Sequence, residues 1–205
     1  MEKQKNKNYA DDVIPCPAEL VKEAELLIQN IREITKYTFS ELFTETENKG
    51  RNEYYRNNSI WQKEIEYNTW DKNELKKLEK VQDERKEMNE VKGLYIFYED
   101  DKPVYVGISR LILKRLKHHF LGKVHNEATL VYLMLRHKHD RKGRIYDGLR
   151  SDLQIFKDER ESKQEEMRKK WKIAIIPQTN NYKMYFFEIY LACYLKTVWN
   201  SFETH

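Results

Sequence analysis

Apolar residues recur at helical spacing along the first long segment of the chain, residues 18–43. The stripe consists of Leu20, Ala24, Leu27, Ile28, Ile31, Ile34 and Leu42. This period is typical of an amphipathic helix, whose stripe must be buried against the rest of the protein or a second subunit. Residues 44–60 are polar and contain Gly50, so they predict a loop. A thinner stripe predicts another helix over residues 71–89; its members are Leu75, Leu78, Val81 and Met88.

The pattern changes at Lys92 from helical spacing to short apolar runs. Residues 93–98 are aromatic and β-branched and predict a strand, and residues 104–108 predict another. The link between them, residues 99–103, has the acidic residues and the proline that favour a turn. Two strands joined by so short a link are expected to form an antiparallel hairpin.

The rest of the chain alternates between helical and strand patterns. The elements predicted there are a helix over residues 109–121 with Ser109 as its N-cap, a helix over 126–137, a polar loop and solvated helix over 138–170, a third strand over 171–176, and a strongly apolar helix over 182–199.

Together these elements predict an α+β fold, in which helices flank a small central three-stranded antiparallel sheet. The chain divides where the pattern changes. Residues 1–91 are expected to form a helical N-terminal region that serves packing, recognition or oligomerisation. Residues 92–205 are expected to form one module with a polar insertion at residues 138–170.

The composition suits a protein with a real core and a heavily solvated surface. Of its 205 residues, 40% are hydrophobic and 35% are charged. No stretch approaches the roughly 20 consecutive apolar residues of a membrane span, and the polar, lysine-rich N-terminus does not fit a signal peptide. The two cysteines, Cys16 and Cys193, lie too far apart to suggest a disulfide framework or a zinc site. We therefore expect a reducing, cytoplasmic compartment and no membrane partner.

Charge is distributed unevenly between the two halves of the chain. Residues 1–90 contain 16 Lys and Arg against 20 Asp and Glu, a net charge of −4. Residues 91–205 contain 22 Lys and Arg against 14 Asp and Glu, a net charge of +8. A polyanionic partner is therefore expected to bind mostly to the second half.

Glu188 is the single charged residue between Lys183 and Lys196, in a segment of large apolar side chains. A carboxylate in such surroundings is costly to ionise unless a cation or a strong donor accompanies it. A salt bridge to a core arginine and a functional site explain this residue equally well, and the motifs that precede it favour the functional site.

The predicted hairpin carries Gly93-Leu94-Tyr95 on one strand and Tyr105-Val106-Gly107 on the other. With this pair the chain resembles the GIY-YIG endonuclease superfamily, which is named for two such tripeptides about ten residues apart. The family then has an arginine on the next helix, often followed one turn later by a histidine. It ends with a glutamate on a later helix and an asparagine about a dozen residues further. The matching positions here are Arg115, His119, Glu188 and Asn200.

The resemblance covers residues 92–205 and implies a metal-dependent endonuclease. It makes Glu188 the metal ligand, and its carboxylate suits Mg²⁺, with Mn²⁺ as a substitute. Arg115 would stabilise the transition state, because its guanidinium offers several donors to phosphate oxygens. Either Tyr95 or Tyr105 would be the general base, and Tyr95 is the preferred choice.

Positive charge from the metal, Arg115 and Lys102 would lower the tyrosine's pKa from its ordinary value near ~10. His119 would bind phosphate or relay a proton, and Asn200 would orient the site. Gly107 would either bring the backbone close to a phosphate or serve as a simple turn glycine.

Basic residues around the predicted site are candidates for contact with double-stranded DNA. Those on the helix with Arg115 and on the hairpin are Lys102, Lys114, Lys117, His118 and Lys123. The alternative is an ordinary solvated face, and the basic context favours contact with the DNA backbone. In the N-terminal region, the loop at residues 51–58 could read a groove through Arg51 and Arg56, although an ordinary surface loop explains it as well. The two histidines in residues 137–140 favour a basic loop over a metal site.

The leading hypothesis is a sequence-specific restriction-type or defence endonuclease, because both the N-terminal region and the polar insertion offer surface for recognition. The alternatives are a structure-specific repair or recombination nuclease, and a nucleic-acid-binding subunit with weak activity. If a palindromic site is cut on both strands, a homodimer or higher homo-oligomer is the natural arrangement.

Overall fold

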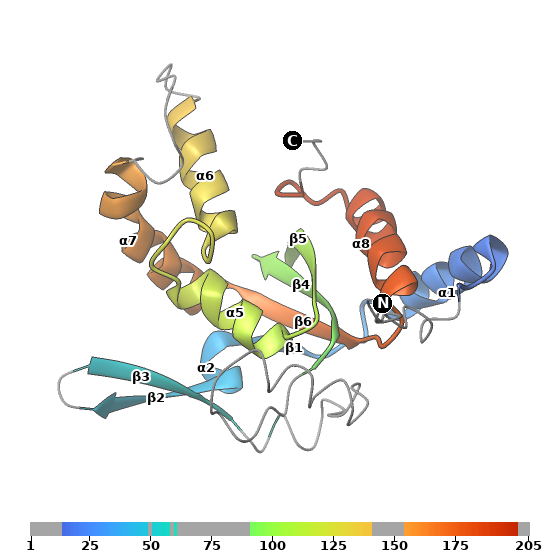
Figure 1. The fold of residues 1–205 in the computed structure, drawn as a ribbon, viewed down its shortest axis with the longest axis horizontal. Helices are drawn as coiled ribbons and strands as arrows, with labels where there is room; N and C mark the ends of the chain where they lie inside the picture. The colour runs from blue at the N-terminus through green and yellow to red at the C-terminus, as the bar shows by residue number, and fades with distance from the viewer. Residues whose placement is uncertain (1–13, 49–50, 58–59, 61–90, 141–153, 201–205) are drawn as a thin grey trace, which may run out of the picture.

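The computed structural model describes residues 14–48, 51–57, 60, 91–140 and 154–200 (Figure 1). The helix predicted over residues 71–89 lies outside these residues, as does most of the loop predicted in the polar insertion. In order along the chain, the elements are α1 (Pro17–Asn30), β1 (Lys36–Thr38), α2 (Phe39–Leu42), β2 (Phe43–Asn48), β3 (Arg51–Arg56), β4 (Gly93–Glu99), β5 (Lys102–Ser109), α5 (Ile112–Leu121), α6 (Thr129–Asp140), α7 (Gln154–Lys170), β6 (Lys172–Pro177) and α8 (Asn181–Leu195).

The main sheet has four strands in the order β1-β6-β4-β5, and every neighbouring pair is antiparallel. The predicted hairpin is β4–β5, and the predicted third strand is β6, which pairs with β4. The α+β class is therefore confirmed, but the sheet has four strands where three were expected. The additional strand, β1, comes from the N-terminal region and forms one edge of the sheet. The other edge is β5.

Alternation along β4 builds two apolar cores, one on each face of the sheet. Tyr95 and Phe97 face the core that is shared with α2, α5, α6 and α7. Leu94, Ile96 and Tyr98 face the core that is shared with α1 and α8. Successive strand residues point to opposite faces, so a strand that is buried on both faces reads as a continuous apolar run. Figure 1 shows the helices on the two sides of the sheet.

The single helix predicted over residues 18–43 is wrong beyond Asn30. Thr38 begins a new helix, because its hydroxyl accepts a hydrogen bond from the Glu41 amide while the Glu41 carboxylate accepts one from the Thr38 amide. Thr38 itself is extended, with φ −76° and ψ 163°, so no continuous helix runs through this position. The apolar spacing continued by coincidence, since Ile31 and Leu42 belong to the cores on opposite faces of the sheet.

The prediction of a polar loop over residues 44–60 is also wrong, because β2 and β3 form a two-stranded antiparallel sheet there. The register runs from Phe43 opposite Arg56 to Asn48 opposite Arg51. Phe43 is buried and Tyr54 packs against the same core, whereas the residues from Thr44 to Glu47 are exposed. A ribbon with so little buried surface has no apolar alternation along most of its length, so periodicity does not reveal it.

The remaining helices have shifted ends. Ser109 ends β5, where its hydroxyl accepts a hydrogen bond from the Leu111 amide, and α5 begins only at Ile112. α8 ends at Leu195 because Lys196 adopts the left-handed conformation, with φ 52° and ψ 45°. Among the described helices, none is both long and apolar enough to cross a membrane.

The solvated helix predicted in the polar insertion corresponds to α7, and one side of α7 is buried against α5. Its Gln164 is buried and donates hydrogen bonds to the carbonyl oxygens of His119 (3.1 Å) and Gly122 (3.0 Å) at the end of α5. Arg168 donates to the Phe120 carbonyl at 2.7 Å. These side chains satisfy carbonyls that have no partner within their own helix. α7 therefore holds the C-terminal end of α5 in place.

We predict that a fragment of residues 92–205 aggregates or is insoluble. The deletion removes β1, which leaves one edge of β6 unpaired, and removes Ala24 of α1 and the adjoining Ile31, which are buried on the core under α8. Uncovered apolar surface and a bare strand edge both promote association. Soluble yield and size-exclusion chromatography of the fragment and the full chain provide the measurement. A soluble, monodisperse and fully active fragment would contradict the prediction.

Candidate active site

Two tyrosines from neighbouring strands lie on the same face of the sheet, near the β5 edge. Tyr95 on β4 and Tyr105 on β5 have ring centroids 6.1 Å apart. Phe97 pairs with Tyr105 across the strands, and their rings stack at 5.9 Å. Tyr95 is fully buried, with 0% exposure, whereas Tyr105 is partly exposed. The tyrosine on the edge strand is therefore the one nearer to solvent.

Gly107 leaves the space that the Tyr95 ring occupies. It lies opposite Tyr95 in the strand register. A Cβ at this position would be 2.4 Å from both Cζ and the hydroxyl oxygen of Tyr95, and 2.8 Å from Cε1 of Tyr105. Such distances are far inside van der Waals contact, so only glycine fits. Gly107 is therefore required for the packing of Tyr95. This role differs from both roles considered from the sequence, a phosphate contact and a simple turn glycine.

His119 on α5 meets Tyr95 in the core. The Tyr95 hydroxyl and Nε2 of His119 are 2.8 Å apart, and both side chains are fully buried. Burial, together with the positive charges of Arg115 and His118, holds the pKa of His119 well below its usual value. The imidazole is therefore neutral. Nδ1 is buried and has no hydrogen-bond partner among the described residues.

The unpartnered Nδ1 favours one tautomer of His119. A buried acceptor without a donor is tolerated better than a buried N–H without an acceptor. Placing the proton on Nε2 leaves Nδ1 as the acceptor, and Nε2 then donates to the Tyr95 oxygen. The Tyr95 hydroxyl in turn remains free to donate its own proton.

Arg115 lies one helical turn before His119, on the same side of α5. Its Nη1 donates to the Glu127 carbonyl at 3.2 Å and its Nη2 donates to Oγ1 of Thr129 at 2.8 Å. The guanidinium also interacts with both tyrosine hydroxyls and lowers the pKa of each. The sequence-predicted arginine and histidine are thus brought together with the tyrosine pair.

The pKa values of the two tyrosines respond differently to this arrangement. Burial raises the pKa of Tyr95 well above its ordinary value, and Tyr105 raises it further. Burial also raises the pKa of Tyr105, and Arg115 opposes that rise. The interaction between the two hydroxyls lowers the pKa of Tyr105 and raises that of Tyr95, so it favours the phenolate at Tyr105 over the phenolate at Tyr95. His119 therefore contacts Tyr95, and Tyr95 lies beside Tyr105, which is the more exposed of the two tyrosines.

Glu188 reaches the same edge of the sheet from α8, which packs along β5. Its carboxylate is close enough to Tyr105 to raise that residue's pKa. Partial burial raises the pKa of Glu188 itself from 4.5 to about 7. No hydrogen bond or ion pair to this carboxylate occurs among the residues that the structure describes. The core salt bridge considered from the sequence is therefore not seen there.

The donor set at Glu188 fits a divalent cation of the magnesium kind. A partly buried carboxylate without a counter-charge gains most from a cation, and Mg²⁺ commonly binds through one or two carboxylates, with water and substrate phosphates as its other ligands. Within the described ranges, no three residues among His, Cys, Asp and Glu cluster as a closed metal site would require. A metal at Glu188 would therefore draw its remaining ligands from water and the substrate.

Asn200 holds the edge strand that carries Tyr105. Its Oδ1 accepts a hydrogen bond from the Val106 amide at 2.8 Å and its Nδ2 donates to the Val106 carbonyl at 2.7 Å. Thr197 donates to the same Oδ1 at 2.8 Å. The amide thus takes the place of a paired strand at the β5 edge, which gives Asn200 an orienting role.

The predicted DNA-contact residues are scattered over the surface. Lys114 is exposed and His118 is partly buried, with a pKa that burial lowers. Nζ of Lys117 donates to the Tyr54 carbonyl at 2.6 Å and lies over the Phe43 ring, so this lysine ties α5 to the β2–β3 hairpin.

The other basic residues that were predicted to contact DNA are not part of the cluster around Tyr95 and Tyr105. Lys102 is exposed at the β4–β5 turn, opposite Glu99, and is not among the causes of either tyrosine's pKa shift. Lys123 is exposed between α5 and α6. Arg51 and Arg56 lie on β3, at the tip and the base of the β2–β3 hairpin.

The two histidines near the end of α6 contact side chains of neighbouring elements. The ring of His137 packs edge-on against Trp199 at 5.6 Å. Nε2 of His139 lies 3.2 Å from Glu159 on α7, and Lys138 binds the same carboxylate at 2.7 Å. These contacts join α6 to its neighbours, and residues 137–140 end that helix where the sequence predicted a loop.

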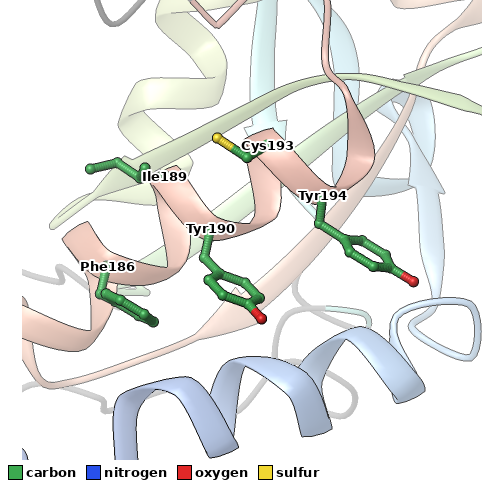
Figure 2. Close-up of a pocket in the computed structure, with 5 residues that line it drawn as sticks. All are labelled: Phe186, Ile189, Tyr190, Cys193 and Tyr194. Carbon is green, nitrogen blue, oxygen red and sulfur yellow. The ribbon is translucent and has the colours of Figure 1, made fainter. Parts of the chain in front are cut away.

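An apolar hollow on α8 lies on a different face of that helix from Glu188. It is lined by Phe186, Ile189, Tyr190, Cys193 and Tyr194 (Figure 2). Figure 2 shows the three aromatic side chains directed toward α1. Ile189 is 52% exposed and Tyr194 is 59% exposed. All five of the lining residues belong to α8.

Sequence patterns did not single out two parts of the site. Thr129 and the Glu127 carbonyl, which bind Arg115, lie in and next to a loop whose composition is ordinary. The only available signal was position, since Thr129 begins the helix that follows the arginine helix. Tyr95, Tyr105, Arg115, His119 and Glu188, by contrast, were named from the sequence and do gather at the β5 edge.

Comparison with known proteins gives one match. A model of the GIY-YIG catalytic domain matches residues 91–190. This range includes both tyrosines, Arg115, His119 and Glu188, and it excludes Asn200. No curated protein and no solved structure matches the chain significantly.

Proposed function

Residues 91–190 belong to the GIY-YIG family of nucleases, and from that premise we propose that the chain is a divalent-metal-dependent endodeoxyribonuclease of the restriction type. The observation that carries the proposal is the partly buried Glu188 carboxylate, which has no counter-charge among the described residues and lies beside the Tyr95–Tyr105–Arg115 cluster. Mg²⁺ is the proposed ion, with Mn²⁺ as a substitute, and double-stranded DNA is the proposed substrate.

Each side chain has a role in hydrolysing a phosphodiester. A divalent cation bound to Glu188 would supply Lewis-acid stabilisation of the charge on the phosphoryl oxygens. Arg115 presents its remaining N–H groups to the same oxygens. The attacking water must lose a proton, and a tyrosine phenolate accepts it and becomes the neutral hydroxyl; nearby positive charge favours that phenolate by lowering the tyrosine's pKa.

We favour Tyr105 as the general base, although the sequence pointed to Tyr95. Tyr105 is partly exposed, and although burial raises its pKa, Arg115 and the Tyr95 hydroxyl act to lower it and so favour its phenolate. Tyr95 is fully buried, so solvent water does not reach its hydroxyl. In this arrangement the contact between His119 and Tyr95 lies on the buried side of Tyr105. Asn200 holds the strand that carries it.

We predict that Glu188→Gln stabilises the protein at pH 8 and has little effect at pH 4. A carboxyl whose folded-state pKa is raised from 4.5 to about 7 contributes stability below pH 4.5. That contribution is lost as the pH rises through 7. Glutamine does not ionise, so the variant avoids the loss. The expected gain in Tm at pH 8 is about 2–4 °C, because solvent screens the carboxylate in part.

Thermal melting at pH 4 to 8 measures this effect, with Glu25→Gln on the exposed side of α1 as the matched control. Addition of Mg²⁺ or Mn²⁺ at pH 8 should raise the Tm of the wild type but not of Glu188→Gln, because the ion binds only the folded state. Equal pH dependence in both variants would contradict the assigned environment of Glu188. An equal metal effect in both would contradict its role as a ligand.

The restriction-type assignment rests on surfaces outside the catalytic domain. The N-terminal region contributes β1 to the sheet, packs α1 on α8 and places Arg51 and Arg56 on the β2–β3 hairpin. We propose that this region stabilises the fold and contributes to DNA recognition. A homodimer is part of the proposal, since cutting a palindromic site on both strands calls for two-fold symmetry. Two free, exposed cysteines, Cys16 and Cys193, suit a cytoplasmic protein.

Digestion of genomic DNA followed by sequencing of the ends separates the candidate functions. A restriction-type enzyme gives ends that share one short sequence. A structure-specific repair or recombination nuclease leaves linear duplex intact and cuts branched or bubble-containing DNA. A binding subunit retards DNA without cutting it. Ends without any common sequence would contradict the restriction-type assignment and leave the nuclease activity in place.

A further inference from the structure

The short connection between α5 and α6, together with the first residue of α6, supplies two acceptors to the guanidinium of Arg115. The Glu127 carbonyl accepts from Nη1 at 3.2 Å, and Oγ1 of Thr129 accepts from Nη2 at 2.8 Å. Both acceptors come from a segment that lies 12 to 14 residues beyond the arginine. Two of the five guanidinium donors are therefore fixed by the protein itself.

This connection is closely packed, so its acceptors are held in place. A Cβ on Gly122 would lie 2.4 Å from the His118 carbonyl oxygen and 2.6 Å from Cβ of Glu127, so glycine is required there. The Glu127 carboxylate accepts a hydrogen bond from the Lys123 amide at 3.1 Å. From α7, Gln164 donates to the Gly122 carbonyl at 3.0 Å. The segment therefore has little freedom to move away from Arg115.

We propose that Thr129 is a positioning residue that orients the Arg115 guanidinium for the scissile phosphate. This inference rests on the proposed function of Arg115. A guanidinium rotates about its Nε–Cζ bond and swings on a flexible stem, so one anchored edge decides which N–H groups remain for the substrate. Thr129 makes the shorter of the two anchoring bonds. It does not contact the reacting atoms itself.

The pair Thr129→Val and Thr129→Ser isolates the hydrogen bond from the shape of the side chain. Valine is close in shape to threonine but has no acceptor, whereas serine retains the hydroxyl. We expect the single-turnover cleavage rate of supercoiled plasmid with Mg²⁺ to fall by about 10- to 100-fold in Thr129→Val, because small misplacements of a catalytic group have effects of this size. Thr129→Ser should recover most of the rate, and the affinity for DNA should be unchanged in both. Thr44→Val, an exposed threonine on β2, is the matched control.

A second readout follows the guanidinium directly and does not need cleavage. In protein with isotope-labelled arginine, NMR measures the exchange between Nη1 and Nη2 that accompanies rotation of the guanidinium. Exchange at Arg115 should be at least about 10-fold faster in Thr129→Val than in the wild type or Thr129→Ser. Arg160 is an internal control, because its guanidinium binds Gln164 and Gly122 and not Thr129.

The outcomes separate this inference from the proposed function. Faster rotation and slower cleavage in Thr129→Val, both recovered by serine, would support the positioning role. Unchanged rotation at Arg115, or a wild-type cleavage rate in Thr129→Val, would overturn it. A wild-type cleavage rate in Arg115→Ala would instead overturn the catalytic assignment of the arginine, and the rotation rate would still decide whether Thr129 holds it.

Discussion

Glu188→Gln is expected to abolish DNA cleavage while DNA binding persists. Glutamine keeps the size of the side chain but removes the negative charge that attracts a divalent cation. Without that ion, the charge on the phosphoryl oxygens is left to Arg115 alone. The expected loss in single-turnover rate is at least about 10³-fold, more than the loss of one transition-state donor. Plasmid cleavage with Mg²⁺ and a gel-shift assay with Ca²⁺ measure the two effects separately.

Glu25→Gln on the exposed surface of α1 is the control for loss of one negative charge, and it should cleave at the wild-type rate. Circular dichroism and thermal melting exclude a folding defect in Glu188→Gln, which is expected to be at least as stable as the wild type at pH 8. A variant that retains more than about a tenth of the wild-type rate would show that Glu188 is not the metal ligand.

Arg115→Ala is expected to slow the chemical step by about 10²–10³-fold, the usual effect of removing one preorganised transition-state donor. Lys114→Ala removes a neighbouring positive charge that is exposed to solvent. A single phosphate contact mainly contributes affinity, so that variant should change DNA binding and its salt dependence more than the rate at saturation. Single-turnover kinetics at several salt concentrations distinguish the two effects.

Alanine also removes the anchoring bonds of Arg115 to Glu127 and Thr129, so Arg115→Lys is a useful second variant. Lysine retains the charge but not the planar set of donors, and an intermediate rate is expected. If Arg115→Ala and Lys114→Ala lowered the saturating rate equally, the arginine would have no special place in the transition state.

The elements that carry most of the site were predictable from the sequence because their patterns are strong. β4 and β6 are short apolar runs, and α8 is apolar around its whole circumference. β1 could not be found in this way, since Lys36–Thr38 is three residues long and lies in what reads as a continuous helical stripe. The β2–β3 hairpin was missed for a related reason, because among its described side chains Phe43 and Tyr54 are the hydrophobic ones that pack on the core.

The residues of the site were named through the motif, and their environments needed the structure. The spacing from Tyr105 to Arg115 placed the arginine but not its anchor at Thr129, because that contact depends on how the chain turns after α5. Lys117 was named for DNA, yet it binds the Tyr54 carbonyl, 63 residues away in sequence. Likewise, the difference in burial between Tyr95 and Tyr105 follows from the strand order, in which β5 is an edge.

A time course of supercoiled plasmid with the full-length protein, in Mg²⁺ and in excess EDTA, tests the central claim most directly. We expect nicked or linear products to accumulate with Mg²⁺ or Mn²⁺, and the plasmid to stay intact when EDTA removes the ion. Equal cleavage in both conditions would contradict the metal dependence. An intact plasmid in Mg²⁺ and in Mn²⁺, at protein concentrations that retard the same DNA, would contradict the assignment of this chain as a plasmid-cleaving endonuclease.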